Sequence, residues 1–253
     1  KYVKLFFMNY KKHILSETCK LSDALVVLNS LKRDAICFVV KEGDCLIGSL
    51  TDGDVRRALI DGKAMNSCVV DVIQSHPKYI DIDKVDVSEI KLWRESNFLI
   101  LPIIEGEAKK IKGVLNLRIQ KSLLPIDVVI MAGGKGTRLL PLTNETPKPL
   151  LPIGGKPIIS YTLNRLCDYG ISKAYLSVNY LADKLAGFSK KWNQKNKLKT
   201  SLLLEPNYFG TIGSLSLIKK FYHETILVCN SDILTNINLE EFYLDFINND
   251  CEM

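Results

Sequence analysis

The sequence predicts an α/β fold in two parts, a repeated α+β part followed by a part built on a mostly parallel sheet. Segments with helical and with strand spacing alternate along the whole chain. Before residue 124, one order of elements, helix–strand–turn–strand, occurs twice. After residue 126, single strands alternate with single helices, an order typical of parallel sheets that bind ligands at the carboxyl ends of their strands.

The first copy of the repeat begins with a helix for which Ser22 is the expected N-cap, and Gly62 ends its last helix. Its predicted elements are a helix at 22–32, strands at 35–40 and 45–50, and a helix at 52–61. The predicted elements of the second copy are a helix at 87–95 and strands at 99–104 and 111–117. Each copy alone has too little core, so we expect the two to pack together.

The second part begins with an apolar strand that runs directly into glycine. Its predicted strands are at 127–131, 173–178, 198–204 and 225–229. Its predicted helices are at 157–169, 182–192 and 239–247, with another around 212–220. We therefore expect a ligand site at the carboxyl edge of a parallel sheet.

The composition excludes several classes of protein. The net charge is +6, but the basic residues are scattered, which favours a solvated surface over a nucleic-acid-binding face. A modest positive charge also suits an enzyme that attracts phosphorylated substrates. No apolar run reaches the roughly 18 residues expected of a membrane helix. Neither nucleic acid nor a membrane is therefore an expected partner.

Cysteine and histidine usage indicates free thiols and no zinc site. The 7 cysteines form no Cys-x-x-Cys pair, and the 3 histidines show no metal-ligand spacing. Buried free thiols in a reducing cytoplasm are expected. The residues before Met8 are too few for a signal peptide, so we expect Met8 to be the native start.

The segment from Gly48 to Asp54 follows the pattern Gly-x-x-Thr-x-x-Asp at the end of the first copy. On this motif and the repeat, the first part resembles a tandem pair of CBS domains, modules that commonly bind adenine nucleotides and that hint at a homo-oligomer. The resemblance implies that Thr51 holds phosphate or ribose and that Asp54 accepts hydrogen bonds from the ribose diol. The alternative is that both residues only stabilise the start of a helix. Residues 113–119 of the second copy lack both the hydroxyl and the carboxylate, so we expect no ligand there.

Residues 133–138, Gly-Gly-Lys-Gly-Thr-Arg, have the composition of a phosphate-binding loop, because glycine lets backbone N–H groups approach an anion. A dinucleotide-binding Gly-x-Gly-x-x-Gly pattern fails, since Leu139 stands at its third glycine. A P-loop also fails, because Pro157 follows Gly155-Lys156 where Ser or Thr is needed. The plain alternative is a tight turn from strand to helix without a ligand.

Three further motifs accompany this loop: Pro147-Lys148, the segment 205–213, and Asn230-Ser231-Asp232 at a strand end. Together they resemble the nucleotidyltransferases that make nucleoside-diphosphate sugars. The resemblance implies a Rossmann-like domain that transfers a nucleotidyl group from a nucleoside triphosphate to a sugar 1-phosphate. Combined with a CBS pair, the chain is similar to bacterial GDP-amino-sugar guanylyltransferases of surface-glycan biosynthesis, with nucleotide binding at the CBS pair as the expected regulation.

The resemblance also implies a role for each site residue. Arg138 would stabilise charge on the leaving pyrophosphate, Lys148 would neutralise the α-phosphate and the attacking sugar phosphate, and Asp232 would hold Mg²⁺. The other expected nucleotide contacts are Ala132, Gly133, Gly134, Gly136, Thr137, Glu205, Gly210 and Thr211. Each charged residue alone also has a structural interpretation, as a surface cation, a loop lysine or a helix cap. Their joint order favours the catalytic one.

Glu205 bears on the choice of base. Guanine presents two adjacent donors, N1–H and N2–H₂, and a carboxylate can accept from both. Uracil and thymine offer a donor beside an acceptor, which suits glutamine better. Glu205 therefore favours GTP, the alternative being that it ends its strand as a solvated acid.

We expect two domains, a regulatory CBS pair at 8–123 and a nucleotidyltransferase domain at 126–253. The family continues beyond the length seen here, with sugar contacts and a second metal-binding Asp, so we expect a truncated chain with weak activity or none. The competing hypothesis is an inactive protein whose CBS pair senses adenine nucleotides. The intact Arg138, Lys148 and Asp232 argue against that loss.

Overall fold

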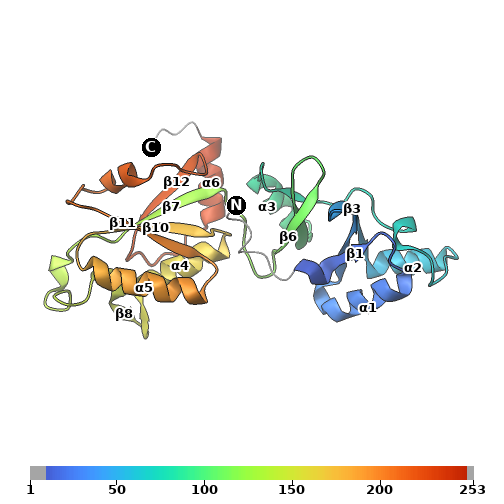
Figure 1. Ribbon diagram of the computed structural model, residues 1–253, viewed down its shortest axis with the longest axis horizontal. Helices are drawn as coiled ribbons and strands as arrows, with labels where there is room; N and C mark the ends of the chain where they lie inside the picture. The colour runs from blue at the N-terminus through green and yellow to red at the C-terminus, as the bar shows by residue number, and fades with distance from the viewer. Residues whose placement is uncertain (1–9, 250–253) are drawn as a thin grey trace. The chain divides into compact units, whose positions relative to one another are not determined.

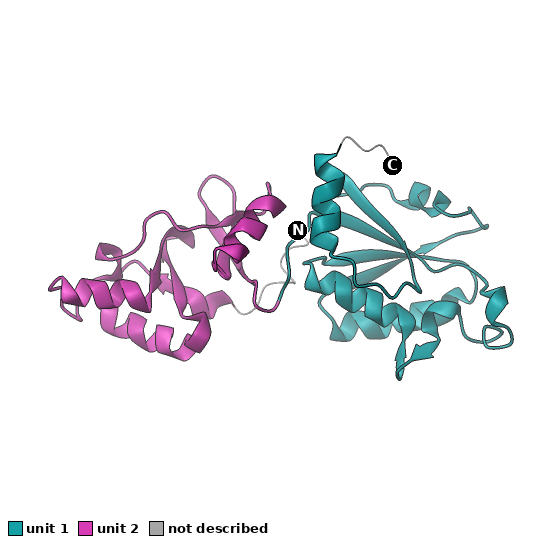
Figure 2. Ribbon diagram, turned by 180° about the vertical axis from the view of Figure 1, so that it is seen from behind, with its two compact units in different colours: residues 1–6, 120–253 teal, residues 7–119 magenta. Residues whose placement is uncertain are grey.

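The computed structural model describes residues 10–249, which form two compact units that divide between Ile119 and Gln120 (Figure 2). The expectations for Met8 and Cys251 lie outside the described residues. A mixed sheet precedes the division and a parallel sheet follows it (Figure 1). The predicted α/β class is therefore confirmed in both parts.

The first unit contains a six-stranded sheet in the order β1-β2-β3-β6-β5-β4. Its first copy comprises β1 (Ile14–Ser16), α1 (Leu21–Leu31), β2 (Ile36–Lys41), β3 (Cys45–Thr51) and α2 (Asp52–Ile60). Its second copy comprises β4 (Ile80–Asp81), α3 (Val87–Glu95), β5 (Ile100–Glu105) and β6 (Lys110–Asn116). Short 3-10 helices lie at Tyr10–His13, Lys32–Asp34 and Val69–Asp71. The mirrored strand order confirms the internal repeat.

The two copies share one core. Within the described residues, β3 meets β6 at one residue pair, Cys45 and Lys110. The backbone N–H groups of Leu46 and Ile111 each donate across this junction at 3.0 Å. Buried side chains of both copies pack in a single cluster that contains Phe38, Val40, Leu46, Ile100, Ile104, Ile111 and Val114. The expectation that the copies pack together is thus confirmed.

The start of α1 differs from the prediction. The N-cap is Lys20 rather than Ser22, and no side chain caps the helix. The first amides instead donate to backbone carbonyls of a distant segment, that of Leu21 to Ser67 and that of Ser22 to Met65, both at 3.0 Å. Tertiary contact thus supplies the acceptors that a capping hydroxyl would otherwise provide.

The second unit contains a four-stranded sheet in the order β11-β10-β7-β12, in which every neighbouring pair is parallel. Its strands are β7 (Ile126–Met131), β10 (Lys173–Val178), β11 (Lys199–Leu204) and β12 (Thr225–Asn230), and a small hairpin joins β8 (Pro152–Ile153) to β9 (Lys156–Pro157). Its α-helices are α4 (Ile158–Asp168), α5 (Ala182–Lys195) and α6 (Leu239–Asn248). The 3-10 helices are η5 (Thr137–Leu139), η6 (Lys148–Leu150) and η7 (Gly213–Leu217).

The connection from β11 to β12 is less helical than predicted. Only η7 forms where a helix was expected around 212–220. Leu215, Leu217, Ile218 and Phe221 of this connection pack against the sheet core around Val129. Serine, glycine and isoleucine are weak helix formers, so the segment has little intrinsic tendency to form a helix. The packing of its apolar side chains against the sheet therefore determines its conformation.

A buried carboxylate anchors the end of the same connection. Asp127, at the start of β7, is 5% exposed. Its Oδ2 accepts the backbone N–H groups of Tyr222 and His223 at 2.6 and 2.9 Å. The chain therefore enters β12 from a backbone position set by Asp127.

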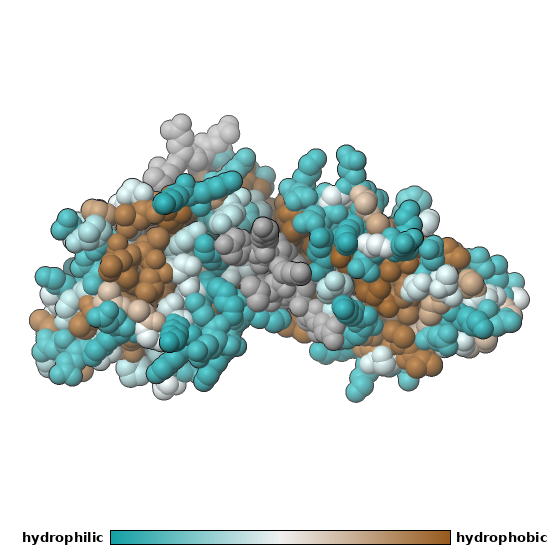
Figure 3. Space-filling view, in the orientation of Figure 1, coloured by the Kyte–Doolittle hydropathy of each residue, from teal (hydrophilic) through white to brown (hydrophobic). Residues whose placement is uncertain are grey.

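The visible surface mixes hydrophobic and hydrophilic residues, and the described cysteines are unpaired. Figure 3 shows hydrophobic patches on the visible face, bordered by hydrophilic residues. Within residues 10–249, no helix combines the length and the hydropathy that crossing a bilayer requires. The six described cysteines are free thiols. Burial raises the pKa of Cys37 to about 12 and that of Cys229 to about 11.

Candidate functional site

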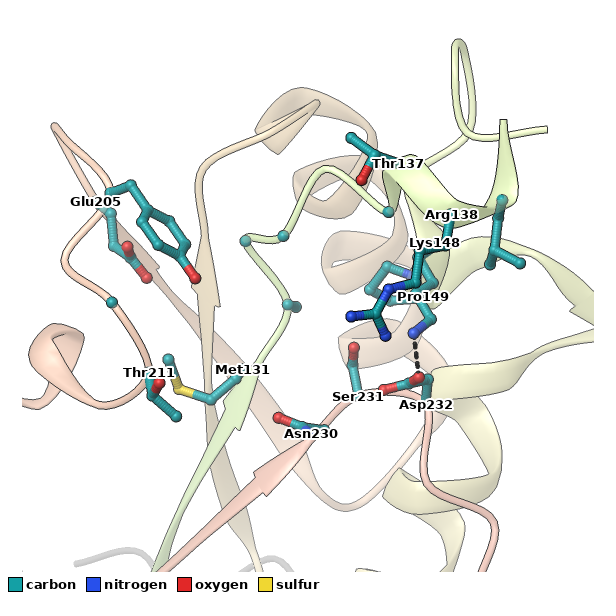
Figure 4. A pocket seen from close by; sticks show the side chains of 17 residues that line it. Met131, Thr137, Arg138, Lys148, Pro149, Glu205, Thr211, Asn230, Ser231 and Asp232 are labelled. Atoms are coloured by element: carbon teal, nitrogen blue, oxygen red, sulfur yellow. Dashed lines mark ion pairs between the residues drawn. The ribbon is translucent and has the colours of Figure 1, made fainter. Parts of the chain in front are cut away.

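A cavity of about 420 Å³ lies where the strands β7, β11 and β12 end (Figure 4). We call it the glycine-loop cavity, after the glycine loop at residues 132–138. It is lined by every residue that the sequence predicts for catalysis, nucleotide binding and metal binding in this unit: Ala132, Gly133, Gly134, Gly136, Thr137, Arg138, Lys148, Glu205, Gly210, Thr211 and Asp232. Four segments of the sequence therefore meet at the carboxyl edge of the sheet.

The conformation of the glycine loop requires glycine at residue 136 and leaves little room for a side chain at residue 133. Gly136 has φ = 64°, in the left-handed region, and a Cβ there would lie 2.9 Å from Cγ2 of Thr143. A Cβ on Gly133 would lie 3.2 Å from the backbone nitrogen of Asn179. The Thr143 hydroxyl donates to the Gly136 carbonyl at 2.9 Å, and the Tyr180 hydroxyl donates to the Thr143 carbonyl at 2.9 Å. The loop is thus held from outside the cavity, and its inner side stays open.

At one end of the cavity, the charged side chains leave an excess of positive charge. The Lys148 ammonium forms an ion pair with Oδ2 of Asp232 (Figure 4). Arg138 is exposed, and its guanidinium has no ion-pair partner in the part of the chain that the structure describes. Figure 4 shows all three side chains at one end of the cavity. Two cations face one carboxylate there, which favours binding of an anion.

Glu205 lies at the other end of the cavity, with Thr211 (Figure 4). Its side chain is 4% exposed, so it is not the solvated acid of the alternative interpretation. Oε1 accepts the Ser177 hydroxyl, and Oε2 accepts the Phe209 backbone N–H at 3.2 Å. Each carboxylate oxygen has a second lone pair, so Glu205 can hold its loop and still accept a further donor.

Sequence reasoning did not assign a role to some residues that line the cavity, among them Tyr208, Ser231 and Met131. Tyr208 and Ser231 stand inside motifs that the sequence had already singled out. Their position within those motifs was the available signal. Met131 is the last residue of β7, directly before the glycine loop.

The cleft of the repeated unit, which we call the repeat cleft, has a volume of about 530 Å³. It is lined from both copies by Arg33, Asp34, Ala35, Ile36, Phe38, Ser49, Thr51, Asp54, Arg57, Gln74, His76, Pro77, Lys78, Asn97, Phe98, Leu99, Ile100, Leu101 and Arg118. Both residues predicted for the CBS ligand, Thr51 and Asp54, are among them. Arginine, lysine and histidine outnumber the two carboxylates of the lining.

Thr51 and Asp54 form a capping box at the start of α2. Oδ2 of Asp54 accepts the Thr51 N–H at 2.8 Å and its hydroxyl at 2.6 Å, while Oδ1 accepts from Arg57 at 2.6 Å and from Gln74 at 3.0 Å. Burial alone would raise the pKa of Asp54, but these hydrogen bonds outweigh burial and lower it below the usual value. A ribose diol could bind Asp54 only by replacing one of these four donors.

The second copy has no counterpart of this box. Asn116 stands at the position of Thr51, and a turn follows it instead of a helix. The Asn116 amide donates to Asp34 at 3.0 Å, and Nε of Arg118 lies 3.2 Å from the same carboxylate. These polar side chains therefore bind one another across the cleft.

Comparison with known proteins identifies the second unit. Residues 127–252 match the sequence model of the family described as "Nucleotidyl transferase". The bifunctional protein GlmU of Methanocaldococcus jannaschii is 35% identical over 117 residues, which are 46% of this chain and 27% of that protein. The mannose-1-phosphate guanylyltransferase of Mycobacterium tuberculosis is 35% identical over 124 residues, which are 48% of this chain and 33% of that protein. The chain thus spans about a third of these relatives or less.

Solved structures resemble the first unit. The CBS domains of a transcriptional regulator from Streptococcus pneumoniae align with a TM-score of 0.38 and 15% identity, over 47% of this chain and 94% of that chain. The crystal structure of CBSX2 in complex with AMP aligns with a TM-score of 0.36 and 22% identity, over 46% of this chain and 89% of that chain. In its second unit, at residues 127–252, the chain belongs to the nucleotidyl transferase family and is related to GlmU proteins and to mannose-1-phosphate guanylyltransferases.

Proposed function

We propose that the protein transfers a nucleotidyl group from a nucleoside triphosphate to a sugar 1-phosphate. The observation that carries the proposal is the meeting of Arg138, Lys148 and Asp232 beside the glycine loop in one cavity. In the reaction, an oxygen of the sugar phosphate bonds to the α-phosphorus. The bond from that phosphorus to the bridging oxygen breaks, and pyrophosphate leaves with the electron pair. Family membership supports this reaction class.

Each charged residue has a task that its position allows. Phosphate chemistry of this kind depends mainly on positioning and on neutralising charge. The glycine loop would hold the triphosphate through backbone N–H groups. Arg138 would stabilise the leaving pyrophosphate, and Lys148 would leave Asp232 to neutralise the α-phosphate and the incoming sugar phosphate. An anionic substrate thereby takes the place of the carboxylate as the partner of Lys148.

Asp232 would hold Mg²⁺, which neutralises phosphate charge when bound. Its side chain is 28% exposed and lines the cavity, and its ion pair with Lys148 is made through Oδ2. Mg²⁺ typically takes one or two protein carboxylates together with phosphate oxygens and water. Among the described residues, no cluster of three or more histidine, cysteine or acidic side chains could hold a metal ion. The donor set therefore fits an ion that shares its ligands with a bound triphosphate.

GTP is the proposed nucleotide. The free lone pairs of the Glu205 carboxylate match the adjacent N1–H and N2–H₂ donors of guanine. Several relatives of similar identity are named guanylyltransferases, which supports the same base. An amino-sugar phosphate of surface-glycan synthesis is the proposed acceptor class.

The test measures pyrophosphate release by the full-length protein with GTP, UTP, dTTP, CTP and ATP, using glucosamine 1-phosphate and mannose 1-phosphate as acceptors. We expect GTP to lead and Arg138→Ala or Lys148→Ala to lower the rate by about 100-fold or more, as for other charge-stabilising groups. Lys135→Ala is the matched control, because this exposed loop cation does not line the cavity. A clear lead of UTP or dTTP would contradict the GTP assignment, and unaffected rates in the alanine variants would contradict the site.

The repeat cleft is the proposed regulatory site, with an adenine nucleotide as ligand. Its cationic lining supports an anionic ligand. Because a helix begins after Thr51 but only a turn follows Asn116, we propose one nucleotide per chain, at the Thr51 end. Calorimetric titration with AMP and ATP tests this, and a stoichiometry of two or no binding would contradict it. A change in pyrophosphate release on adding the same nucleotide would establish the regulation.

A further inference from the structure

Tyr208 lies in the glycine-loop cavity but has no part in the proposed chemistry. It lines the cavity together with Glu205, Gly133 and Gly134. Its side chain is 72% exposed. Among residues 10–249, no hydrogen bond, aromatic contact or cation–π contact involves its ring or hydroxyl. A large planar side chain is thus left without a partner inside a cavity of nucleotide size.

The backbone beside Tyr208 is fixed even though its ring is free. Oε2 of the buried Glu205 carboxylate accepts the N–H of Phe209, the next residue, at 3.2 Å. The Glu205 carbonyl accepts the Asn179 side-chain amide at 2.9 Å. The ring of Tyr208 is therefore presented from a short, anchored turn. Because this backbone is already ordered, stacking on a ligand costs conformational freedom only in the side-chain torsions of Tyr208.

The two ends of the cavity differ in chemistry (Figure 4). Arg138, Lys148 and Asp232 stand at one end, and Glu205 and Thr211 stand at the other. A triphosphate at the cationic end directs its base toward Glu205. Tyr208 belongs to the same turn as Glu205, so its ring lines the end where a base would lie.

We propose that Tyr208 stacks its ring on the face of the nucleobase. The inference rests on the proposed nucleotide binding and assigns different roles in that binding to Tyr208 and Glu205. Every base has a π-face, so stacking strengthens the binding of all nucleotides alike. The edge of the base is read by Glu205. Tyr208 therefore determines affinity for the base, and Glu205 determines the choice between bases.

The experiment titrates the chain with GTP, UTP and inorganic tripolyphosphate in the presence of Mg²⁺, using Tyr208→Ala and the ring-retaining control Tyr208→Phe. Stacking on one aromatic ring typically contributes enough that its loss weakens binding about tenfold. We expect that loss for GTP and for UTP with Tyr208→Ala, no loss with Tyr208→Phe, and no change for tripolyphosphate, which has no base. Circular dichroism verifies that both variants fold.

The outcomes separate this inference from the proposed function. Unchanged GTP binding by Tyr208→Ala, beside a wild type that binds GTP, overturns the stacking role alone. Equal weakening of GTP and tripolyphosphate also overturns it, because the substitution would then act on the loop rather than on the base. A wild type that binds neither GTP nor UTP overturns the proposed function as well.

Discussion

The glycine-loop cavity is shaped mainly by backbone conformation, whereas the repeat cleft is shaped by polar side chains that bind one another. In the former, Gly136 has a left-handed φ and packs against Thr143, and Lys148 and Asp232 form one ion pair. In the latter, Asp54 alone accepts four hydrogen bonds. The first arrangement leaves backbone groups and a cation free for a ligand, while the second satisfies its polar groups before any ligand arrives. The two should therefore respond to different substitutions.

The largest effect is expected from Gly136→Ala. A Cβ there combines left-handed strain with contacts at 2.9 Å to Thr143 and 3.3 Å to Lys148. We expect a loss of about 3 kcal/mol in the free energy of unfolding of this unit, from roughly 1–2 for strain and 1–3 for crowding, and a loss of triphosphate binding. Urea unfolding and nucleotide titration measure both.

Gly155→Ala is the control for that substitution. Gly155 also has a left-handed φ of 78°, but a Cβ there would meet nothing within 4 Å, and the residue does not line the cavity. The Gly155→Ala variant should lose only about 1 kcal/mol in the free energy of unfolding, because of backbone strain, and should keep its nucleotide affinity. Equal effects of the two substitutions would show that crowding around Gly136 does not shape the loop.

An intermediate effect is expected from Asp54→Asn in the repeat cleft. The substitution removes a carboxylate that accepts from Thr51, Arg57 and Gln74, which should lower the free energy of unfolding by about 2 kcal/mol at pH 7. Because the folded pKa lies below the usual 3.8, this stabilisation is present above pH 3.8 and is lost as the pH falls through the folded pKa.

Unfolding of wild type and variant at neutral and acidic pH provides the measurement, and Asp52→Asn is the matched control. Asp52 lies in the same helical turn but is exposed. It should change stability by less than about 1 kcal/mol, through the helix dipole alone. A difference between wild type and Asp54→Asn that persisted unchanged to the lowest pH would argue against the ionised carboxylate as its source.

The smallest effect is expected from Arg118→Gln. The Arg118 side chain is 35% exposed and its partner Asp34 is 15% exposed, so the pair is partly screened by solvent. Its removal should lower stability by about 0.5–1 kcal/mol, and less at high salt. Arg33→Gln is the comparison, since Arg33 is exposed and contributes its carbonyl rather than its charge to this network. Salt-independent loss in the Arg118 variant would contradict the ion-pair explanation.

Most of the glycine-loop cavity was predictable because its segments, all except Pro147-Lys148, are short motifs that directly follow a strand. Residues 132–138 follow β7 and Ser231-Asp232 follow β12, so strand prediction alone brings them to one edge of the sheet. The helix bounds of α3 and the strand bounds of β10 also agree with the local pattern. Most of the helices and strands could thus be predicted from the local spacing of apolar residues.

The missed features depend on partners that are far away in sequence. The amides at the start of α1 find acceptors at Met65 and Ser67, which no local pattern around Ser22 indicates. Glu205 was expected in the site, but its hydrogen bond with the Ser177 hydroxyl of the neighbouring strand has no local signal. In each case the competing contact is visible only once the chain has folded.

The two buried carboxylates that bracket the connection from β11 to β12 give its parts different freedom. Glu205 holds the turn through Phe209, and Asp127 holds the far end at Tyr222 and His223. Between these anchors, Leu215, Leu217, Ile218 and Phe221 pack against the sheet, so only a short stretch around Thr211 separates the anchored turn from the core. Thr211 lines the cavity from that stretch, and the turn before it gives the cavity a wall whose backbone is already ordered when a ligand arrives.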